Sequence, residues 1–261
     1  MSKLDLARKA AKHTVHMEAA YEEEIKKCIQ NSIIYGKDTK FDKPFYPNSH
    51  NIYLWDKDSV SAAQYCAANP EFGKVAVLNF ASYRNPGGRF LDGSMAQEEA
   101  LCHASYLYNV LKGLPEYYEW NNQHKNNALY TNRAIYSPGI LFNPETRNEF
   151  RCDVVTCAAP NLNPYYKYNN GSITLQENAK VLNSRMAFLL KIAIENNVDT
   201  FILGAWGCGV FRQSPTEVAK FFMKNIYAYS SSSIKNFVFA IPDKDSENYL
   251  AFEEVLSDDQ F

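Results

Sequence analysis

The chain has 261 residues, of which 46% are hydrophobic and 21% are charged, and this is the composition of an ordinary globular protein that can bury a sizeable core. Its formal net charge is −2 at pH 7, so it lacks the basic balance of a dedicated nucleic-acid-binding protein. Composition and charge therefore favour a small or locally charged ligand over a polyanion that is held across a broad surface.

The six cysteines form no CxxC pair and have no zinc-like spacing with the five histidines. We therefore expect reduced, mostly structural thiols, with no metal and no cofactor. Residues 1–27 are charged throughout and lack the apolar core of a secretory signal, and no window approaches about 18 consecutive apolar residues. The expectation is a cytoplasmic protein without a membrane span.

Apolar spacing predicts strands that alternate with helices. In the first half of the chain, the predicted elements are one or two helices over 3–33, a strand over 51–55, a helix over 59–70, a strand over 74–81, a helix over 95–111 and a surface connection over 113–130. In the second half, they are a strand over 153–161, a helix over 176–197, a strand over 200–209, a helix through Val218, Phe222, Ile226 and Tyr229, a strand over 236–243, and a short helix through Phe252, Val255 and Leu256. Four of the strands are nearly continuous apolar runs, which is typical of strands buried on both faces. We expect one α/β domain with a mostly parallel sheet, because no repeat or linker interrupts the chain.

Three motifs follow predicted strands, where open α/β sheets bind their ligands. They are NFASYRNPGG from Asn79, APNLNPYY from Ala159, and GAWGCGVFRQSP from Gly204. Glycines in the third motif would let backbone amides turn towards an anion, and the helix that begins near Pro215 would add a positive dipole end. The alternative is that these glycines only make a tight turn. The pattern is neither a P-loop nor GxGxxG.

Two adjacent glutamates, Glu98 and Glu99, open the helix that follows the first glycine loop. Neighbouring residues on a helix diverge by about 100°, so the two carboxylates cannot share one face. Glutamates in a first helical turn are usually surface charges that complement the helix dipole. Beside a glycine loop and between apolar segments, one of them could instead protonate a leaving oxygen or activate water. The helix end would lower its pKa and burial would raise it.

These motifs resemble those of a known family. LNFASYRNPGGRFLDGSMAQEE, residues 78–99, resembles the signature of the bacterial-type poly(ADP-ribose) glycohydrolases, a branch of the macrodomain fold. YSPGILF, DVVTCAAPN, ILGAWGCGVF, and FVFAIPD with the following ENYLAF resemble the same family in the same order. The resemblance covers residues 50–256 and implies a three-layer α/β/α macrodomain-like fold with a mostly parallel, mixed central sheet. Residues 1–49 would add extra N-terminal helices as an accessory segment of a single domain over 1–261.

The resemblance also implies roles for single residues. Glu99 would be the general acid and base, and Glu98 would hold a ribose hydroxyl. The substrate-binding residues would be Asn79 and Ser82 at the ribose, Gly87 and Gly88 on one side of the diphosphate, the loop of Gly207, Cys208, Gly209, Val210 and Phe211 on the other side, and Gln97. Phe211 would pack against the distal ribose. A single carboxyl group that acts first as an acid and then as a base would suffice for an oxocarbenium-like transition state.

Two positions depart from the family pattern. Arg89 stands where the family signature has a third glycine, and Arg212 stands where a small residue is common. Arg89 could donate to the diphosphate, point into solvent, or narrow the pocket and weaken activity. These substitutions bear on catalytic competence and not on the fold.

Two further residues leave alternatives open. His103 is either a packed histidine or a catalytic one, and the packed alternative is the commoner in proteins. Trp206 either anchors its loop or forms a platform for an adenine ring.

The resemblance implies an enzyme that hydrolyses ribose–ribose O-glycosidic bonds from the chain end and releases ADP-ribose. The alternatives are an ADP-ribose reader with little turnover, and a hydrolase of mono-ADP-ribose on protein or nucleic acid. Intact Glu98 and Glu99 favour an enzyme, because a reader needs no acid there. The expected partners are ADP-ribose and poly(ADP-ribose) on modified proteins, with nucleic acid only as an ADP-ribosylated substrate, no membrane, and a monomeric chain.

Overall fold

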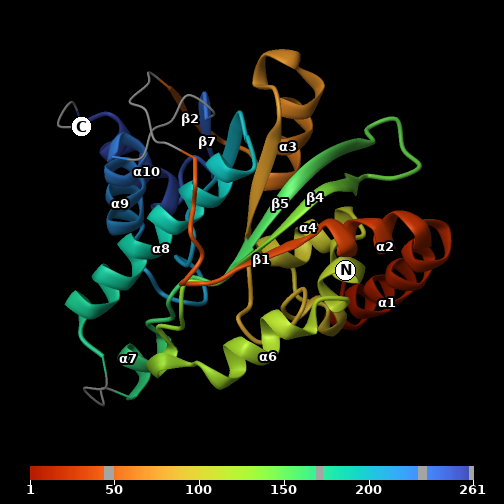
Figure 1. Cartoon of the computed structure of the whole chain (residues 1–261), viewed down its shortest axis with the longest axis horizontal. Coiled ribbons are helices and arrows are strands. Elements are labelled where there is room, and N and C mark those ends of the chain that lie inside the picture. Colours follow the sequence, from red (N-terminus) through yellow and green to blue (C-terminus); the bar gives the residue numbers. More distant parts are fainter. Residues whose placement is uncertain (44–49, 169–172, 229–233, 259–261) are drawn as a thin grey trace.

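The computed structural model describes residues 1–43, 50–168, 173–228 and 234–258, and it shows one seven-stranded sheet with helices on both faces (Figure 1). The strands are β1 (Ile33–Tyr35), β2 (Asn51–Trp55), β3 (Val75–Phe80), β4 (Ala134–Phe142), β5 (Phe150–Cys157), β6 (Thr200–Leu203) and β7 (Asn236–Ala240). The α-helices are α1 (Lys3–Ala20), α2 (Glu22–Asn31), α3 (Ser59–Ala68), α4 (Gln97–Ala104), α5 (Leu107–Lys112), α6 (Pro115–Gln123), α7 (Asn163–Tyr168), α8 (Leu175–Glu195), α9 (Pro215–Ala228) and α10 (Glu247–Leu256), with 3₁₀ turns η1 (Pro70–Phe72), η2 (Phe90–Asp92) and η3 (Asn126–Ala128).

The sheet is mixed and mostly parallel. Its strand order is β1-β4-β5-β3-β6-β7-β2, and the five strands from β5 to β2 all run in one direction. Strand β4 runs antiparallel to both of its neighbours. The predicted fold class is therefore confirmed, and the carboxyl ends of five strands meet at one edge of the sheet.

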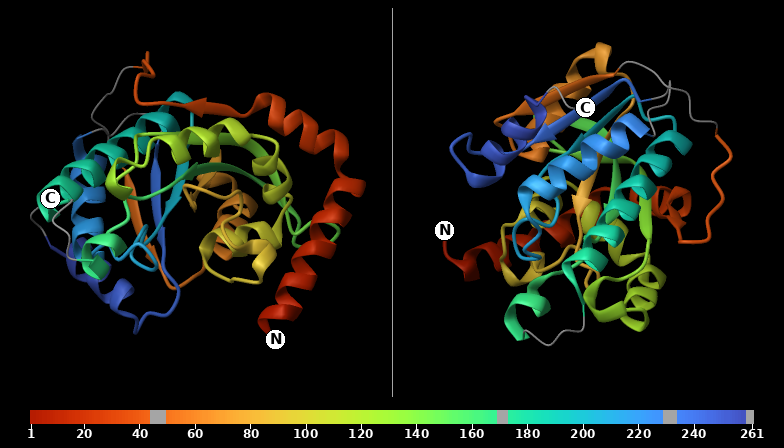
Figure 2. Two further views of the ribbon diagram at one scale, coloured as in Figure 1. Left: turned by 90° about the horizontal axis from the view of Figure 1, so that it is seen from below. Right: turned by 90° about the vertical axis from the view of Figure 1, so that its left-hand side faces the viewer.

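The strand pleat divides the core between two helical layers. Along β3, Val75 and Val77 face one apolar cluster, while Ala76 and Leu78 face the other, as period-two alternation requires. The first cluster lies under α3, α4 and α5, and the second lies under α8, α9 and α10, which cover the opposite face in Figure 2. The sheet is thus the middle one of three layers.

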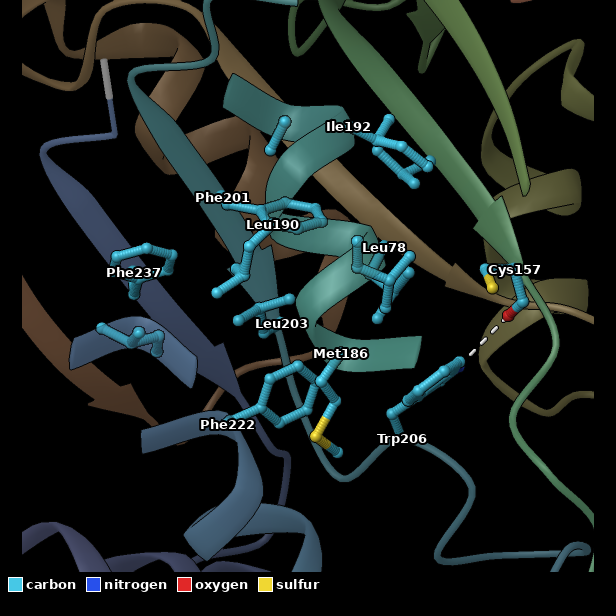
Figure 3. Close-up of a cluster of buried hydrophobic side chains, with 14 of the residues drawn as sticks. Leu78, Cys157, Met186, Leu190, Ile192, Phe201, Leu203, Trp206, Phe222 and Phe237 are labelled. Carbon is cyan, nitrogen blue, oxygen red and sulfur yellow. Dashed lines mark hydrogen bonds between the residues drawn. The ribbon is translucent and has the colours of Figure 1, made fainter. Parts of the chain in front are cut away.

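Large side chains fill the second cluster. Leu78, Met186, Phe201, Leu203 and Phe222 interdigitate there and are buried from solvent (Figure 3). Burial on both faces explains why the central strands are continuous apolar runs in the sequence.

The two N-terminal helices belong to the first cluster. Ala10 and Met17 of α1, and Ile25 and Cys28 of α2, are buried in the same apolar cluster as the side chains of α4 and α5. Helix α1 also contacts the 3₁₀ turn η2, which follows the first glycine loop. The N-terminal segment therefore supports that loop.

Local signals set several helix ends. The Asp58 side chain accepts hydrogen bonds from the backbone N–H groups of Val60 and Ser61, both at 2.9 Å, and so caps α3. Thr174 and Glu177 form a capping box at the start of α8. Helix α3 ends at Ala68, two residues before Pro70, as predicted.

Several sequence predictions need correction. Strand β1 lies partly within the segment predicted as helix over 3–33, and β4 was not predicted at all. Strand β4 contains Pro138 and Gly139, residues that argue against a strand, and the register shifts there at a β-bulge. The connection over 113–130 contains α6, and the strand predicted over 200–209 ends at Leu203. Tyr229, predicted on the helix that is α9, lies outside the described residues.

The helix predicted over 95–111 is two helices, α4 and α5. Ser105 breaks it, because its hydroxyl donates to the Leu101 carbonyl oxygen at 2.7 Å and accepts from the Leu107 N–H at 3.1 Å. A serine that bonds the neighbouring backbone in this way competes with the regular helical ladder. The break turns α5 away from the axis of α4.

Within the described ranges, no helix is both long and apolar enough to cross a membrane. The same ranges contain no group of three or more His, Cys, Asp or Glu residues that could hold a metal ion.

The central position of Leu78 generates a stability prediction. Leu78 is 0% exposed, so Leu78→Ala should lower the free energy of unfolding by about 2–5 kcal/mol through lost burial and the cavity left behind. Leu250→Ala on α10 is the matched control, because Leu250 is 50% exposed and should change stability by less than about 0.5 kcal/mol. Urea denaturation measures both. Equal midpoints for the two variants would contradict the assignment of Leu78 to the core.

Candidate active site

The predicted site residues meet at the edge where β3, β5, β6 and β7 end. The loop after β3 brings Asn79 and Ser82 against the start of α4. The loop after β6 carries Gly207–Phe211 on the other side of β3, because β6 pairs directly with β3. Residues far apart in the sequence are therefore neighbours at this edge.

Glu98 is a buried carboxyl group with donors on both oxygens. It is 3% exposed, accepts from the Ser82 backbone N–H at 2.7 Å, and accepts from the Asn79 side-chain amide at 3.3 Å. Burial, with a smaller contribution from the neighbouring Glu99, raises the pKa of Glu98 to about 8, while the Ser82, Asn79 and Gly87 hydrogen bonds oppose the shift. Glu98 therefore holds a proton at neutral pH.

Glu99 lies beside Glu98 but is less completely bonded. It is 6% exposed, and its Oε1 accepts from the Arg89 backbone N–H at 2.8 Å. Its Oε2 is buried and has no hydrogen-bond partner among the described residues. An unpaired buried carboxylate oxygen is costly, so this atom is poised for a group that the free protein lacks.

Gly88 lies directly between the two carboxyl groups. A Cβ atom there would lie 2.7 Å from Glu99 Oε1 and 2.8 Å from Glu98 Oε2, closer than carbon and oxygen can pack. The residue also has φ +61°, a conformation that favours glycine. Only glycine permits both carboxyl groups to approach this loop.

The amides of the first glycine loop are already engaged. The N–H groups of Ser82, Gly87 and Arg89 point at the glutamates, and that of Gly88 donates to the Asn85 carbonyl oxygen at 3.0 Å. This loop therefore positions the glutamates. Direct contact of Gly87 and Gly88 with a diphosphate stays a prediction.

Gln97 connects strand and helix. Its Oε1 accepts from the Phe80 N–H at 2.8 Å, and its Nε2 donates to the Leu78 carbonyl oxygen at 2.8 Å and to the Ser59 hydroxyl at 3.0 Å. The side-chain amide thus fixes the start of α4 to the end of β3. Its contact with substrate stays a prediction, but its structural role was missed, because no sequence pattern links residues on different elements.

The second glycine loop presents free amides. The backbone N–H groups of Gly207, Gly209, Val210 and Phe211 donate no hydrogen bond to any described residue. Gly209 and Val210 are exposed, and Cys208 is half-buried, with its thiol 3.9 Å from the Trp206 carbonyl oxygen. A row of free amides at the end of a strand is suited to an anion.

Buried side chains hold this loop in place. The Trp206 indole N–H donates to the Cys157 carbonyl oxygen at 3.2 Å, and the ring is 0% exposed (Figure 3). Trp206 is therefore the loop anchor and not an adenine platform. Gln213 donates to the Pro160 carbonyl oxygen at 2.7 Å and exchanges two hydrogen bonds with Asn178 of α8, both at 2.9 Å. The sequence motif gave no sign of the Gln213–Asn178 pair.

Gly207 meets these anchors at close range. A Cβ atom there would lie 2.8 Å from Ala159 Cβ and 2.9 Å from Gln213 Cγ, and its φ is +82°. Arg212, at the departure from the family pattern, has φ +56°, which explains why a small residue would suit that position. The loop tolerates arginine there at some backbone strain.

Two adjoining cavities lie along this edge. One of about 210 Å³ is lined by residues that include Phe211, Gly207 and Val210, and one of about 370 Å³ lies between α4 and the ends of β2 and β7. Phe80, Ala96, Gln97 and Ala205 line both of them. The two cavities therefore form one groove with shared walls, and one wall residue, Gln97, directly precedes the glutamates in the sequence.

Arg89 turns its side chain away from the glutamates. Its Nε donates to Asp92 Oδ2 at 3.1 Å, both side chains are exposed, and its φ of −113° is ordinary for any residue. Of the three predicted alternatives, the solvent-facing one describes this structure. Only its backbone N–H reaches the glutamates.

His103 is packed against Phe90, with ring centroids 4.6 Å apart, and neither ring nitrogen has a described hydrogen-bond partner. The structure therefore favours the packed alternative for His103. The six cysteines are free, and burial raises the pKa of every thiol. They are inert structural groups, as predicted.

The chain is similar to solved structures of bacterial poly(ADP-ribose) glycohydrolases. The enzyme from Thermomonospora curvata is 25% identical, with a TM-score of 0.83 over 96% of this chain and 99% of that chain. The same enzyme bound to the inhibitor ADP-HPD is 26% identical, with a TM-score of 0.80 over 96% of this chain and 98% of that chain. The enzyme from Deinococcus radiodurans in complex with ADP-ribose is 27% identical, with a TM-score of 0.78 over 89% and 97% of the two chains.

None of the curated proteins matches the chain. The family described as microbial-type PARG, catalytic domain, matches residues 6–143, which is just over half of the sequence and includes the glycine loop and both glutamates. Together with the macrodomain-like fold, this match shows that the chain belongs to the microbial-type PARG catalytic-domain family.

Proposed function

We propose that this protein hydrolyses the ribose–ribose O-glycosidic bond of poly(ADP-ribose) from the chain end and releases ADP-ribose. The observation that carries the proposal is Glu99 Oε2, a buried carboxyl oxygen without a described partner, two residues after Gln97, which lines both ligand-sized cavities. A binding protein has no use for such a group, since an unpaired buried oxygen costs stability. A glycosidase needs one to transfer a proton.

In this reaction Glu99 acts twice. It first gives a proton to the ribose oxygen that leaves when the glycosidic C–O bond breaks. It then takes a proton from the water whose oxygen bonds to the same anomeric carbon. Atoms balance, because one water is consumed and each product ends with a hydroxyl group. The oxocarbenium-like transition state is positively charged, so the substrate diphosphate and the carboxylates stabilise it.

Glu98 orients the sugar. Its pKa of about 8 keeps it protonated at neutral pH, and a protonated carboxyl group can donate to a ribose hydroxyl as well as accept from one.

The groove accommodates the rest of ADP-ribose. The free amides of Gly207, Gly209, Val210 and Phe211 suit the diphosphate, and Phe211 lines the cavity beside them. The 370 Å³ cavity, walled by apolar side chains such as Val60 and Ile241, suits a nucleobase. We assign all of residues 1–261 to one domain, because α1 and α2 share the apolar cluster of α4 and α5.

The alternatives are an ADP-ribose reader and a hydrolase of mono-ADP-ribose. The unpartnered oxygen of Glu99 favours an enzyme over a reader. Incubation with poly(ADP-ribose) and with mono-ADP-ribosylated protein, followed by detection of free ADP-ribose, separates the three functions.

The role of Glu99 is tested by Glu99→Gln. Glutamine keeps the volume but cannot exchange a proton, so turnover should fall by about 10²- to 10⁴-fold while ADP-ribose affinity stays within a few fold. Released ADP-ribose and calorimetric titration measure the two quantities. Glu98→Gln is the control and should cost less turnover, because an amide still accepts and donates hydrogen bonds. Near-parental turnover of Glu99→Gln would place the acid elsewhere.

Turnover should fall as the pH rises through about 8. Glu98 holds its proton below its raised pKa and loses it above, and the ionised carboxylate can no longer donate to a ribose hydroxyl. Initial rates between about pH 6 and 10 at saturating substrate would show the decline. A rate that rises through this range would contradict the role of protonated Glu98 in orienting the sugar.

Arg89→Gly should leave ADP-ribose affinity within about fivefold of the parent, since it removes only an exposed ion pair with Asp92 and keeps the backbone N–H that bonds Glu99. Calorimetry with ADP-ribose tests this expectation. Weakening by more than about tenfold, close to the value of a charged hydrogen bond, would mean that the guanidinium turns to the diphosphate on binding.

A further inference from the structure

Helix α1 carries a basic face that the catalytic groove does not use. Arg8, Lys9, Lys12, His13 and His16 line a surface hollow of about 480 Å³, together with Asp5. Positions 5, 9, 12 and 16 follow one another at helical spacing, and from Arg8 to His16 the face extends about 12 Å along the axis. We call these five basic residues the α1 basic face.

The cations of this face are unpaired. No described residue forms an ion pair with Arg8, Lys9 or Lys12, whereas Lys74, Lys235 and Arg151 elsewhere each contact a carboxylate. The one carboxylate in the hollow, Asp5, accepts from the backbone N–H and hydroxyl of Ser2 in the helix cap. Three permanent positive charges therefore face one negative charge that is already engaged.

The nearby cations contribute to lowered pKa values of two imidazoles, those of His13 and His103. Burial lowers the pKa of His13, and the neighbouring His16 and Lys9 lower it further. Burial likewise lowers the pKa of His103 on α4, and Lys9 and His13 add to the shift. At the far end of the α1 basic face, His16 lies 3.2 Å from the Glu145 carboxylate, and this negative charge is where the basic face ends.

The α1 basic face adjoins the catalytic segment. His103 follows Glu99 by four residues, or about one helical turn, and feels the charge of Lys9. Phe90, which directly follows Arg89, packs against the rings of His103 at 4.6 Å and His13 at 6.3 Å. In Figure 2, α1 runs along the outer side of the segment that carries α4 and η2.

We propose that the α1 basic face binds the diphosphate groups of the poly(ADP-ribose) chain next to the terminal unit held in the groove. This inference rests on the proposed function, because an enzyme that works from the chain end encloses one unit and leaves the rest outside. Each outside unit carries two negative charges. Exposed lysines at the rim attract such a chain and raise its affinity without touching the reacting atoms.

The charge and size of the α1 basic face exclude a general nucleic-acid-binding surface. The chain has a net charge of −2, and the α1 basic face is too short for a DNA complex with about 6–10 phosphate contacts. A flexible polymer that is tethered by its own terminal unit needs only a few such contacts, since tethering makes the second contact intramolecular.

The test compares two charge-matched double variants. Lys9→Gln/Lys12→Gln removes two charges from the α1 basic face, and Lys220→Gln/Lys224→Gln removes two exposed charges from α9. The substrates are a long poly(ADP-ribose) and ADP-ribose dimer, each at low and high salt. The α1 variant should raise KM for the long polymer about three- to tenfold at low salt, on the scale of two exposed ion pairs. It should leave kcat unchanged and raise the dimer KM by less than the polymer KM, because the dimer carries only one diphosphate outside the groove.

High salt should abolish the difference between parent and α1 variant, because exposed charges are screened. The α9 variant should behave like the parent throughout. Equal KM values for both double variants, or an equal effect on dimer and polymer, would overturn the proposal. Equal competition by single-stranded DNA of matched charge would overturn it too, since the face would then bind any polyanion.

Activity of the parent protein distinguishes failure of the proposed function from failure of the proposed polymer contact. If the parent releases no ADP-ribose from either substrate, binding of labelled polymer to the two double variants still tests the basic face. Weaker binding of the α1 variant only would support the face, and equal binding would overturn it.

Discussion

The burial of two adjacent carboxyl groups is the constraint on which the site depends. Removing Glu98 and Glu99 from water is costly unless donors are supplied, and the loop after β3 supplies them from its backbone. Amides can reach both carboxyl groups only if the loop comes close, and Gly88 makes the close approach possible. One oxygen of Glu99 still has no partner among the described residues, and burial raises the pKa of Glu98 to about 8, so that Glu98 keeps its proton at neutral pH. The folding free energy that is lost by burying these two carboxyl groups is what makes the site reactive.

This constraint explains the architecture around the site. A loop that must hold two carboxyl groups within hydrogen-bonding distance has to be rigid, and three elements brace it. Gln97 bonds the end of β3 to the start of α4, Phe90 packs under α1, and α1 is itself buried in the cluster below α4. The N-terminal helices are thus part of the support of the site and not an independent appendage. Their outer surface stays available for contacts with a long substrate.

The central strands that alternate with helices, the core and the two glycine loops could be predicted, because each leaves a local pattern in the sequence. Buried strands are apolar runs, and glycines mark close approaches. Strand β4 could not be predicted, since its Pro138 and Gly139 form a bulge that local preferences disfavour. The contacts of Gln97 and Gln213 could not be predicted either, because they join elements that only the tertiary fold brings together. The unpaired state of Glu99 Oε2 is likewise a property of three dimensions.

The two glycine loops divide their work in a way that the sequence pattern did not indicate. Both resemble anion cradles, yet amides of the first loop donate to the protein's own carboxylates, while in the second loop the amides of Gly207 and of Gly209–Phe211 donate to no described residue. The first loop therefore positions the two glutamates, and the second has amides that suit the proposed diphosphate. This division explains how Arg89 can replace glycine. The first loop needs only the backbone N–H of that residue, which any amino acid except proline provides, and the side chain is free to turn to Asp92.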